Sequence, residues 1–398
     1  MTRPLNRRTT LASLAALLSP GALFAAAAIE THAETHTPRL SLIGETTLPH
    51  RLSFKDTTVG GLSALDYDPV DDLWYALSDD RSDINPARFY TFTLALNASS
   101  PALGIARPAL KDVVFLRQAD GSTYPSRKHG GNTPNGPKGP IPDPEGLRFR
   151  PQTRTLLWSS EGDRKLGLDP FVREISLDGK HLREFETPAN LKSSTALPKI
   201  GPRDNLGFEG LAISPDGTSV WVAMEAPLHQ DGPLPTVSAT GGPCRFTCFD
   251  ATTGKPVRQI AYLPDAIPLS PLIPGTYADN GVSEILMQTD KLMLVLERSY
   301  SLGAGNSLRL YRINVDDASN TLEEATLRPG GYQPARKTLI ANFGQKGLKK
   351  LDNTEGLAWG PNRQGPLPGP VQRTLVCISD DNFNPAQITQ IAAFEFID

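Results

Sequence analysis

The chain has 398 residues, of which 39% are hydrophobic and 7% aromatic, and its formal net charge at pH 7 is −3. This length suits one large domain or two ordinary ones, and the near balance of charge argues against a nucleic-acid-binding protein. With 34 Gly and 36 Pro residues, the composition favours many short strands joined by turns over long helices.

The N-terminus has the pattern of an export signal. An apolar run at residues 11–28, interrupted by Pro and Gly near its middle, follows three arginines: Arg3, Arg7 and Arg8. We expect residues 1–33 to be a signal peptide that directs the protein to the periplasm or the cell exterior, and residues 34–398 to form one domain. The alternative, a membrane anchor, is disfavoured because the run is short and broken. The arginine pair resembles a twin-arginine signal, and ordinary secretion is the alternative because no Phe follows it.

A degenerate repeat runs through the rest of the chain. In each copy a small or acidic residue precedes a short apolar strand, a turn rich in Pro, Asp or Gly follows, and a second apolar strand ends on an acid. The five copies begin at Gly60, Asp143, Gly207, Gly281 and Asn353. Further strand pairs with period-2 alternation lie between the copies, so we expect each unit to be a four-stranded antiparallel sheet.

Units of this kind bury their faces when they pack radially, so the pattern predicts an all-β fold, a β-propeller. A blade has about 40–50 residues, so the units carry long insertions, of which 119–142 and 226–243 are rich in Gly and Pro. We expect six four-stranded blades, the sixth assembled from less repetitive sequence. Strands from both chain ends, at 39–48 and 387–397, should close the ring. The alternative, a β-sandwich, would not explain why acids recur at equivalent positions.

Acidic residues recur at two positions of the repeat. One set precedes the first strand: Glu145, Glu209, Glu284 and Glu355. A second set ends the second strand: Asp79, Asp80, Glu161, Asp163, Glu225, Glu297, Asp380 and Asp381. Members of this set are followed directly by Arg81, Arg164 and Arg298. In a propeller such positions converge on one mouth of the central channel, which predicts an acidic mouth. For any single acid, a turn cap or an ion pair with a neighbouring Arg is the alternative.

Carboxylates gathered in such a mouth repel one another and stay ionised only when cations compensate them. A set of oxygen ligands suits a hard cation, and Ca²⁺ is preferred where carboxylates are many. Arginines among the acids suit bidentate binding of a phosphate or a substrate carboxylate.

Six motifs, in chain order, resemble those of a known family: DPEGL, FEGLAISPDG, VAMEAPLHQDGP, LMLVLERSY, NTEGLAWGP and SDDNFNPAQITQIAAFEF. Together they are similar to the phytase-like family ("esterase-like activity of phytase") of exported bacterial proteins, over residues 39–398. The resemblance implies a β-propeller similar to calcium-dependent phytases, in which carboxylates hold Ca²⁺ ions that bind phosphate oxygens and activate water.

The resemblance also implies roles for residues of this chain. It implies that Ca²⁺ is held by Asp79, Asp80, Glu145, Glu209, Glu225, Glu355, Asp380 and Asp381. Acids from the same repeat positions complete the candidate metal ligands: Glu161, Glu284 and Glu297. It implies that Arg81 and Arg298, with Lys128, orient phosphate, and the candidate catalytic residues are Glu209, Glu355, Arg298 and Arg81.

We therefore expect an exported, monomeric, Ca²⁺-dependent hydrolase of small phosphate esters, with no nucleic-acid partner and no membrane insertion after the signal is cleaved. Two alternatives remain. One is a metal-dependent lactonase or carboxylesterase of the gluconolactonase type, and the other is a non-catalytic propeller that binds a ligand or partner. A Ser-His esterase is disfavoured because the chain lacks a GxSxG motif.

Overall fold

The computed structural model describes residues 38–96, 104–128, 136–194, 199–362 and 372–398. The chain divides into two units, Met1–His36 and Thr37–Asp398, and the expected signal at 1–33 lies outside the described residues. The second unit consists of five four-stranded antiparallel sheets and one two-stranded hairpin. No helix in the described part of the chain is both long and apolar enough to cross a membrane.

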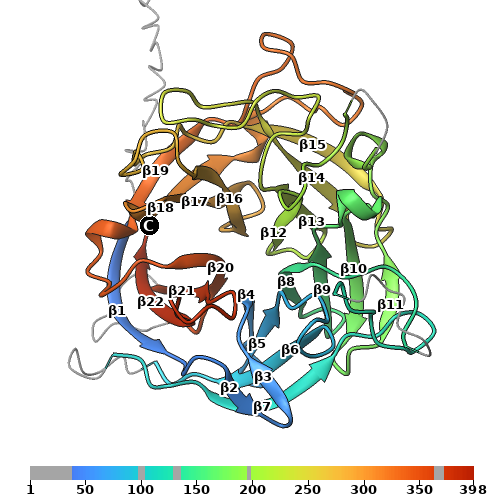
Figure 1. Ribbon diagram of the computed structural model, residues 1–398, viewed down its shortest axis with the longest axis vertical. Helices are drawn as coiled ribbons and strands as arrows, with labels where there is room; N and C mark the ends of the chain where they lie inside the picture. The colour runs from blue at the N-terminus through green and yellow to red at the C-terminus, as the bar shows by residue number, and fades with distance from the viewer. Residues whose placement is uncertain (1–37, 97–103, 129–135, 195–198, 363–371) are drawn as a thin grey trace, which may run out of the picture. The chain divides into compact units, whose positions relative to one another are not determined.

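The five sheets are the blades of a propeller, and each blade runs outward from an innermost strand at the channel (Figure 1). In this order, the first blade comprises β4 (Leu62–Asp68), β5 (Leu73–Ser78), β6 (Arg88–Thr93) and β7 (Ala109–Phe115). The second comprises β8 (Pro144–Arg150), β9 (Thr155–Ser160), β10 (Phe171–Ser176) and β11 (His181–Glu184). The third comprises β12 (Phe208–Ile213), β13 (Ser219–Met224), β14 (Cys244–Asp250) and β15 (Pro256–Tyr262).

The fourth blade comprises β16 (Ala278–Met287), β17 (Leu292–Ser301), β18 (Gly305–Asn314) and β19 (Lys337–Asn342). The fifth comprises β20 (Asn353–Trp359), β21 (Arg373–Asp380), β22 (Gln390–Ile397) and β1 (Arg39–Thr47). The hairpin is β2 (Leu52–Phe54) with β3 (Thr57–Val59). Short 3-10 turns occur at Arg164–Leu166, Ala189–Leu191, Val315–Asp317 and Phe343–Gln345.

The β-propeller predicted from the repeat is confirmed, but the expected number of six blades is wrong. Each of the five repeat copies supplies the two inner strands of one blade, and there is no sixth four-stranded sheet among the described residues. The less repetitive sequence forms loops rather than strands, as in residues 263–277 and 318–336. The count of repeat copies was therefore the better guide to the count of blades.

The ring closes as expected, because β1 pairs antiparallel with β22 along its whole length, from Arg39 opposite Ile397 to Thr47 opposite Gln390. The fifth blade thus contains both ends of the described propeller. The inner strands contact one another in a closed cycle, in the order β4, β8, β12, β16, β20 and back to β4. Because the ring is closed, each blade has a neighbouring blade on both sides.

The core lies between neighbouring blades, where apolar faces of successive sheets pack on one another. Leu157 of β9, Trp221 of β13 and Val295 of β17 belong to one buried cluster that spans the second, third and fourth blades. Trp158 is fully buried, and its ring packs edge-on against Phe171 with centroids 5.0 Å apart. These faces hold the inner strands at fixed positions around the channel.

Every blade has a β-bulge in its inner strand, at the start of the strand in four blades and inside the longer β16 in the fourth. The pairing of the two innermost strands shifts register between Leu62 and Ala64, Pro144 and Leu147, Phe208 and Leu211, Val282 and Glu284, and Thr354 and Gly356. A bulge leaves a residue unpaired and turns its side chain out of the regular alternation. The bulges therefore define five equivalent positions at one end of the channel.

Candidate functional site: an acidic mouth of the propeller

Three of the bulges carry glutamates, which are Glu145 in β8, Glu209 in β12 and Glu355 in β20. A glycine follows each one because the neighbouring inner strand lies very close. A Cβ atom on Gly210 would lie 2.6 Å from the backbone nitrogen of Ile285. The EGL sequence thus combines an acid that faces the channel with a residue that lets the blades meet.

A second ring of side chains comes from the ends of the second strands. In each blade, one residue of the second strand pairs with the residue just before the bulge. The next residue of the second strand has its side chain at the mouth of the channel. These residues are Asp79, Glu161, Glu225, Arg298 and Asp380. Four blades therefore contribute an acid at this level, and the fourth blade contributes a guanidinium.

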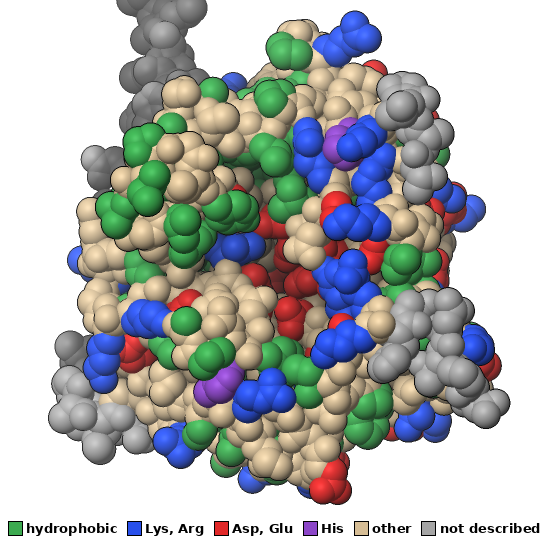
Figure 2. All heavy atoms as spheres, viewed as in Figure 1, with side chains coloured by type: hydrophobic (Ala, Val, Ile, Leu, Met, Phe, Trp, Pro, Cys, Tyr) green, Lys and Arg blue, Asp and Glu red, His purple; other side chains and the backbone are tan. Residues whose placement is uncertain are grey.

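The two rings surround a cavity of about 380 Å³ (the red-lined hollow of Figure 2). Its lining includes seven acids, Asp79, Asp143, Glu145, Glu209, Glu225, Asp279 and Glu355. Only two of its lining residues carry positive charge, Arg81 and Arg298. The cavity is therefore rich in negative charge that its own arginines cannot balance.

Carboxylate oxygens lie close enough together to share a cation. One oxygen each from Asp143, Glu145 and Glu161 lie within 4.8 Å of one another. The same holds for Glu161, Glu209 and Glu225. Glu161 belongs to both groups, so the second and third blades together present a continuous set of oxygen donors.

The two arginines sit on opposite sides of these acids. Arg298 donates from Nη2 to Glu225 Oε1 at 3.0 Å, and its Nε lies 3.7 Å from Glu355 Oε1. Arg81 donates from Nε to Asp143 Oδ1 at 2.5 Å, and its Nη2 lies 3.8 Å from Glu161. Burial by itself would lower the pKa of Arg298, but the Glu355 and Glu225 carboxylates raise it, so its guanidinium keeps its charge.

Charge crowding is visible in the pKa values of the acids. Burial raises the pKa of Glu209 well above its usual range, and the carboxylates of Glu225 and Glu161 raise it further. Burial raises the pKa of Glu225 to about 7, although Arg298 opposes the change. Burial likewise raises the pKa of Asp143 to about 6 against the effect of Arg81. The ionised forms of these groups are costly in the absence of a further cation.

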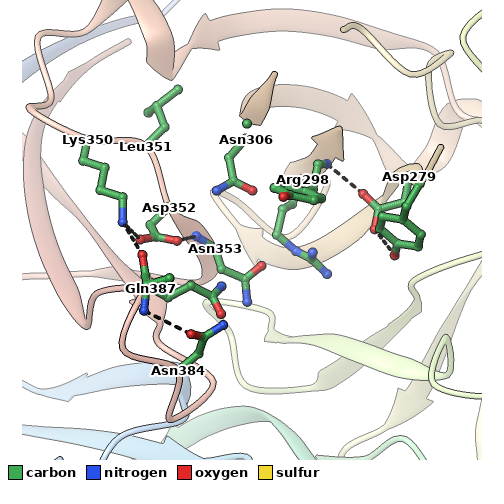
Figure 3. Close-up of a pocket in the computed structure, with 13 residues that line it drawn as sticks. Asp279, Arg298, Asn306, Lys350, Leu351, Asp352, Asn353, Asn384 and Gln387 are labelled. Carbon is green, nitrogen blue, oxygen red and sulfur yellow. Dashed lines mark hydrogen bonds and ion pairs between the residues drawn. The ribbon is translucent and has the colours of Figure 1, made fainter. Parts of the chain in front are cut away.

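A second cavity of about 560 Å³ adjoins the first and shares Tyr277, Asp279, Arg298 and Asn353 with it. Figure 3 shows Arg298 and Asn353 at its centre, with Asp279 to one side. Lys350 on the opposite wall lies 2.7 Å from Asp352 Oδ2, so its charge is compensated. The two cavities form one continuous hollow with an acidic part and a nearly neutral part.

Several acids of the second predicted set serve the blades instead of the cavity. Asp80 forms a buried ion pair with Arg88 at 2.8 Å and accepts backbone N–H groups of the following turn. Asp381 accepts the backbone N–H of Gly61 at 2.9 Å and lies 3.3 Å from His50. Asp163 accepts the N–H of Leu166, which caps a short 3-10 turn.

Asp380 is fully buried beside the mouth. One of its oxygens accepts the N–H of Asn382 at 2.9 Å, while Oδ2 has no hydrogen-bond partner among the described residues. Burial and the carboxylates of Asp79 and Glu355 raise its pKa well above the usual range.

Glu284 and Glu297 do not reach the cavity, and a one-residue offset explains why. In the fourth blade Ser283 occupies the bulge position, so Glu284 stands where the other blades have glycine or alanine. It accepts the N–H of Leu211 at 2.9 Å and pairs with Arg148 at 2.8 Å. Glu297 is also displaced by one residue, because Arg298 occupies the position whose side chain lies at the mouth. Glu297 Oε1 lies 2.5 Å from Lys337 Nζ.

Two predicted basic residues also lie elsewhere. Arg164 donates to the backbone carbonyls of Ile200 and Pro202 and so holds a loop. Lys128 is exposed and is not part of the lining of the acidic cavity.

Sequence reasoning missed several polar residues of the cavity lining, among them Asp143, Asp279 and Asn353. Asp143 and Asn353 stand two residues before the EGL glutamates, so the repeat did carry a signal for both. Asp279 lies in an extension of the fourth blade that has no counterpart in the other copies, and nothing in the repeat pointed to it.

Several solved structures share a distant similarity with this chain. The catalytic domain of a Coprinopsis cinerea α-L-arabinofuranosidase is 11% identical with a TM-score of 0.42, covering 90% of this chain and 97% of its own. An oxidoreductase described as a glucose dehydrogenase from Thermus thermophilus is 12% identical with a TM-score of 0.35, covering 90% and 96%. Kuenenia stuttgartiensis hydrazine synthase is 11% identical with a TM-score of 0.34, covering 83% and 81%. At these values the similarity carries no information about activity.

No curated protein matches the sequence. A family model does match, and its match extends over residues 57–383, which includes every acid of the cavity. The chain therefore belongs to the phytase-like family, described as "esterase-like activity of phytase".

Proposed function

We propose that the protein is a metal-dependent hydrolase of phosphate esters that uses Ca²⁺ bound in the acidic mouth. The observation that carries the proposal is the excess of acids over arginines in one 380 Å³ cavity, with carboxylate oxygens of three residues within 4.8 Å in two overlapping groups. Membership of the phytase-like family supports the same reading.

The residues present fit a hard divalent cation. Their donor atoms are all carboxylate oxygens, the ligands that Ca²⁺ prefers. The buried Oδ2 of Asp380, which lacks a hydrogen-bond partner in the described structure, fits the same reading. The ion would be held by Asp143, Glu145, Glu161, Glu209 and Glu225. When bound, it would polarise an ester oxygen as a Lewis acid and supply the positive charge that the acids lack.

The chain's own residues have separate tasks in this proposal. Arg298 is anchored by Glu225 and lies where both cavities meet, so it can bind and orient an anionic ester oxygen. Arg81 has the same capacity on the other side of the acids, although Asp143 and Asn205 already bond its guanidinium. In hydrolysis, the oxygen of water bonds to phosphorus and the bond to the alcohol oxygen breaks. Glu355, a carboxylate of the mouth outside the set that would hold the ion, takes the proton of the water, and the departing alcohol gains one.

The proposal is tested by phosphate release. Protein loaded with Ca²⁺ should release phosphate from 4-nitrophenyl phosphate or phytate, and a chelator should abolish the release until Ca²⁺ is restored. Glu209→Gln should lower kcat by at least about 100-fold, while the exposed Lys128→Gln should not. Inactivity of Ca²⁺-loaded protein across a panel of phosphate esters would reject the proposal.

A carboxylic ester or lactone is the second candidate. It is favoured by the fact that both arginines are already paired, Arg81 with Asp143 and Arg298 with Glu225, which leaves little positive charge for a dianionic phosphate. A lactone panel with Ca²⁺, Mn²⁺ and Zn²⁺ separates the two candidates. A protein that binds no metal and hydrolyses neither class would be a non-catalytic propeller.

We also propose that the protein is exported and acts as a monomer outside the cytoplasm. Support comes from the arginines before the apolar run at residues 11–28. Cell fractionation of the full chain tests this, and Arg7→Lys with Arg8→Lys distinguishes the twin-arginine route from ordinary secretion. Sedimentation of the exported protein tests its oligomeric state.

A further inference from the structure

The fourth blade projects beyond the others at the mouth. Its inner strand, β16, has ten residues, whereas β8 has seven and β12 has six. The additional pairs lie at the mouth end, where Ala278 faces Ser301 and Asp279 faces Tyr300. Four residues of β16, Ala278–Gly281, precede the bulge position at which β8 begins, and they extend the strand by about 13 Å. We call residues 269–280 and 299–307 the overhang.

The overhang exposes large apolar side chains. Leu272 is 73% exposed, Ile273 66% and Tyr277 62%. Leu302 is also exposed and joins them, because its N–H donates to Tyr277 O and its carbonyl accepts from Leu272 N, each at 3.0 Å. Large apolar residues gathered on one exposed projection mark a binding surface more often than isolated apolar residues do.

This apolar surface is continuous with the acidic mouth. Tyr277 lines both cavities, and its hydroxyl donates to Asp279 Oδ2 at 2.6 Å. Asp279 in turn accepts the N–H of Tyr300 at 2.7 Å, and Arg298 stands two residues before Tyr300 in the same strand. One hairpin therefore carries both the guanidinium of the mouth and the apolar surface above it.

The opposite side of the mouth has a different character. Figure 2 shows green side chains beside the hollow on the side of β16 and β17, and blue side chains across from them. The mouth thus has one apolar edge and one basic edge, an arrangement that orients a molecule with an anionic end and an apolar end.

We infer that the overhang binds the apolar part of the substrate, so that the substrate class is an amphiphilic ester with its ester group in the acidic cavity. The inference rests on the proposed function. A second copy of the chain fits the overhang less well. Its four exposed apolar side chains could bury at most a few hundred Å² of accessible surface, whereas each partner of a stable protein complex buries about 800 Å².

The test compares alkyl chains of increasing length. With Ca²⁺-loaded protein, kcat/KM for monoalkyl phosphates should rise about twofold per methylene, or about 100-fold from methyl to octyl, because a chain on an open surface loses only part of its water contact. The double variant Leu272→Ser, Ile273→Ser should reduce this rise to about 10-fold or less. Its activity on methyl phosphate should equal that of the unmodified protein.

A matched control removes two other apolar residues that are each more than half exposed. Val70 is 75% exposed in the turn between β4 and β5, at the far end of the blade from the mouth, and Val257 is 51% exposed in the outermost strand β15. Val70→Ser with Val257→Ser should leave the dependence on chain length intact. A similar loss in this control would overturn the inference.

Binding separates this inference from the proposed function. Octylphosphonate, which has no ester bond to hydrolyse, should bind Ca²⁺-loaded protein at least 10-fold more tightly than methylphosphonate by calorimetry, and the Leu272→Ser, Ile273→Ser variant should lose the difference. That result supports the overhang even if no phosphate ester is hydrolysed. Equal binding of both phosphonates overturns the inference and leaves the proposed function standing. Concentration-dependent dimers that disappear in the variant, or binding to phosphatidylcholine vesicles that disappears in the variant, would also overturn it.

Discussion

The acids of the mouth and the acids inside the blades come from the same repeat, yet their surroundings differ. Asp80, Glu284 and Glu297 lie against Arg88, Arg148 and Lys337 respectively, and Lys337 also pairs with Asp265. In the mouth seven acids share two arginines. A blade acid completes an ion pair that belongs to the fold, whereas a mouth acid adds negative charge that the fold leaves uncompensated.

The difference predicts that neutralising an acid has opposite effects on stability in the two regions. Neutralising a blade acid leaves a buried cation without its partner, which is strongly destabilising. Neutralising a mouth acid removes repulsion among like charges, which stabilises the metal-free protein and weakens its hold on a cation.

The largest effect is expected from Glu284→Gln. Arg148 is buried and would lose the carboxylate with which it pairs, so the free energy of unfolding should fall by about 3–5 kcal/mol. Denaturant unfolding in the presence of chelator measures the change. Replacing Arg148 with Met in the same protein should recover part of the loss. A loss below about 1 kcal/mol would show that Glu284 is not a structural ion-pair partner.

Calcium itself should also have a large effect. Ca²⁺ at 100 times its Kd should stabilise the folded protein by about 2.7 kcal/mol, because binding favours the folded state. Thermal unfolding with and without chelator shows the shift, and Glu284→Gln should keep the calcium response although its baseline is lower. An unchanged midpoint at millimolar Ca²⁺ would contradict a cation site in the mouth.

The metal-free protein should have an unusual dependence on pH. The folded-state pKa of Glu225 is raised to about 7, above its ordinary value of 4.5, so the folded state holds protons that the unfolded state has released. Through Glu225 alone, the free energy of unfolding of the metal-free protein should therefore fall by about 3 kcal/mol as pH rises from about 4.5 to 7, and Glu284, whose pKa burial also raises to about 7, should add to the fall. Urea midpoints in chelator at several pH values measure this. With Ca²⁺ bound, the fall should be reduced or reversed, and a rise of stability with pH in chelator would contradict the assignment.

The smallest change in the free energy of unfolding is expected from Glu209→Gln, and its sign is opposite to that of Glu284→Gln. Glu209→Gln should raise the stability of the chelated protein by about 1 kcal/mol, because it removes one of several crowded charges. It should also abolish most of the stabilisation by Ca²⁺. Comparing this variant with Glu284→Gln by the same denaturant titration tests the distinction between mouth and blade acids directly. Equal destabilisation in both would remove that distinction.

The repeat was sufficient to predict the propeller, the closure of the ring and the convergence of Glu145, Glu209 and Glu355 on one cavity. It was not sufficient for the fourth blade, where Glu284 resembles the other glutamates in sequence but is displaced by one position. Because strand side chains alternate between faces, a displacement of one residue changes what a side chain contacts. The position of the bulge decides which side chains of the strand face the channel. That position depends on how two strands pair, so the sequence of one strand does not show it.

Pairing of β1 with β22 has a consequence for the kinetics of folding. Arg39 faces Ile397, so the pairing joins segments at opposite ends of the described propeller. Bringing ends this distant together costs about 5 kcal/mol of chain entropy before any contact repays it. During synthesis β1 is made long before β22 and stays without its partner until β22 emerges, with an open edge that can pair wrongly. The pairing of β1 with β22, which closes the ring, is therefore also the folding step that we expect to limit the rate and the accuracy of folding.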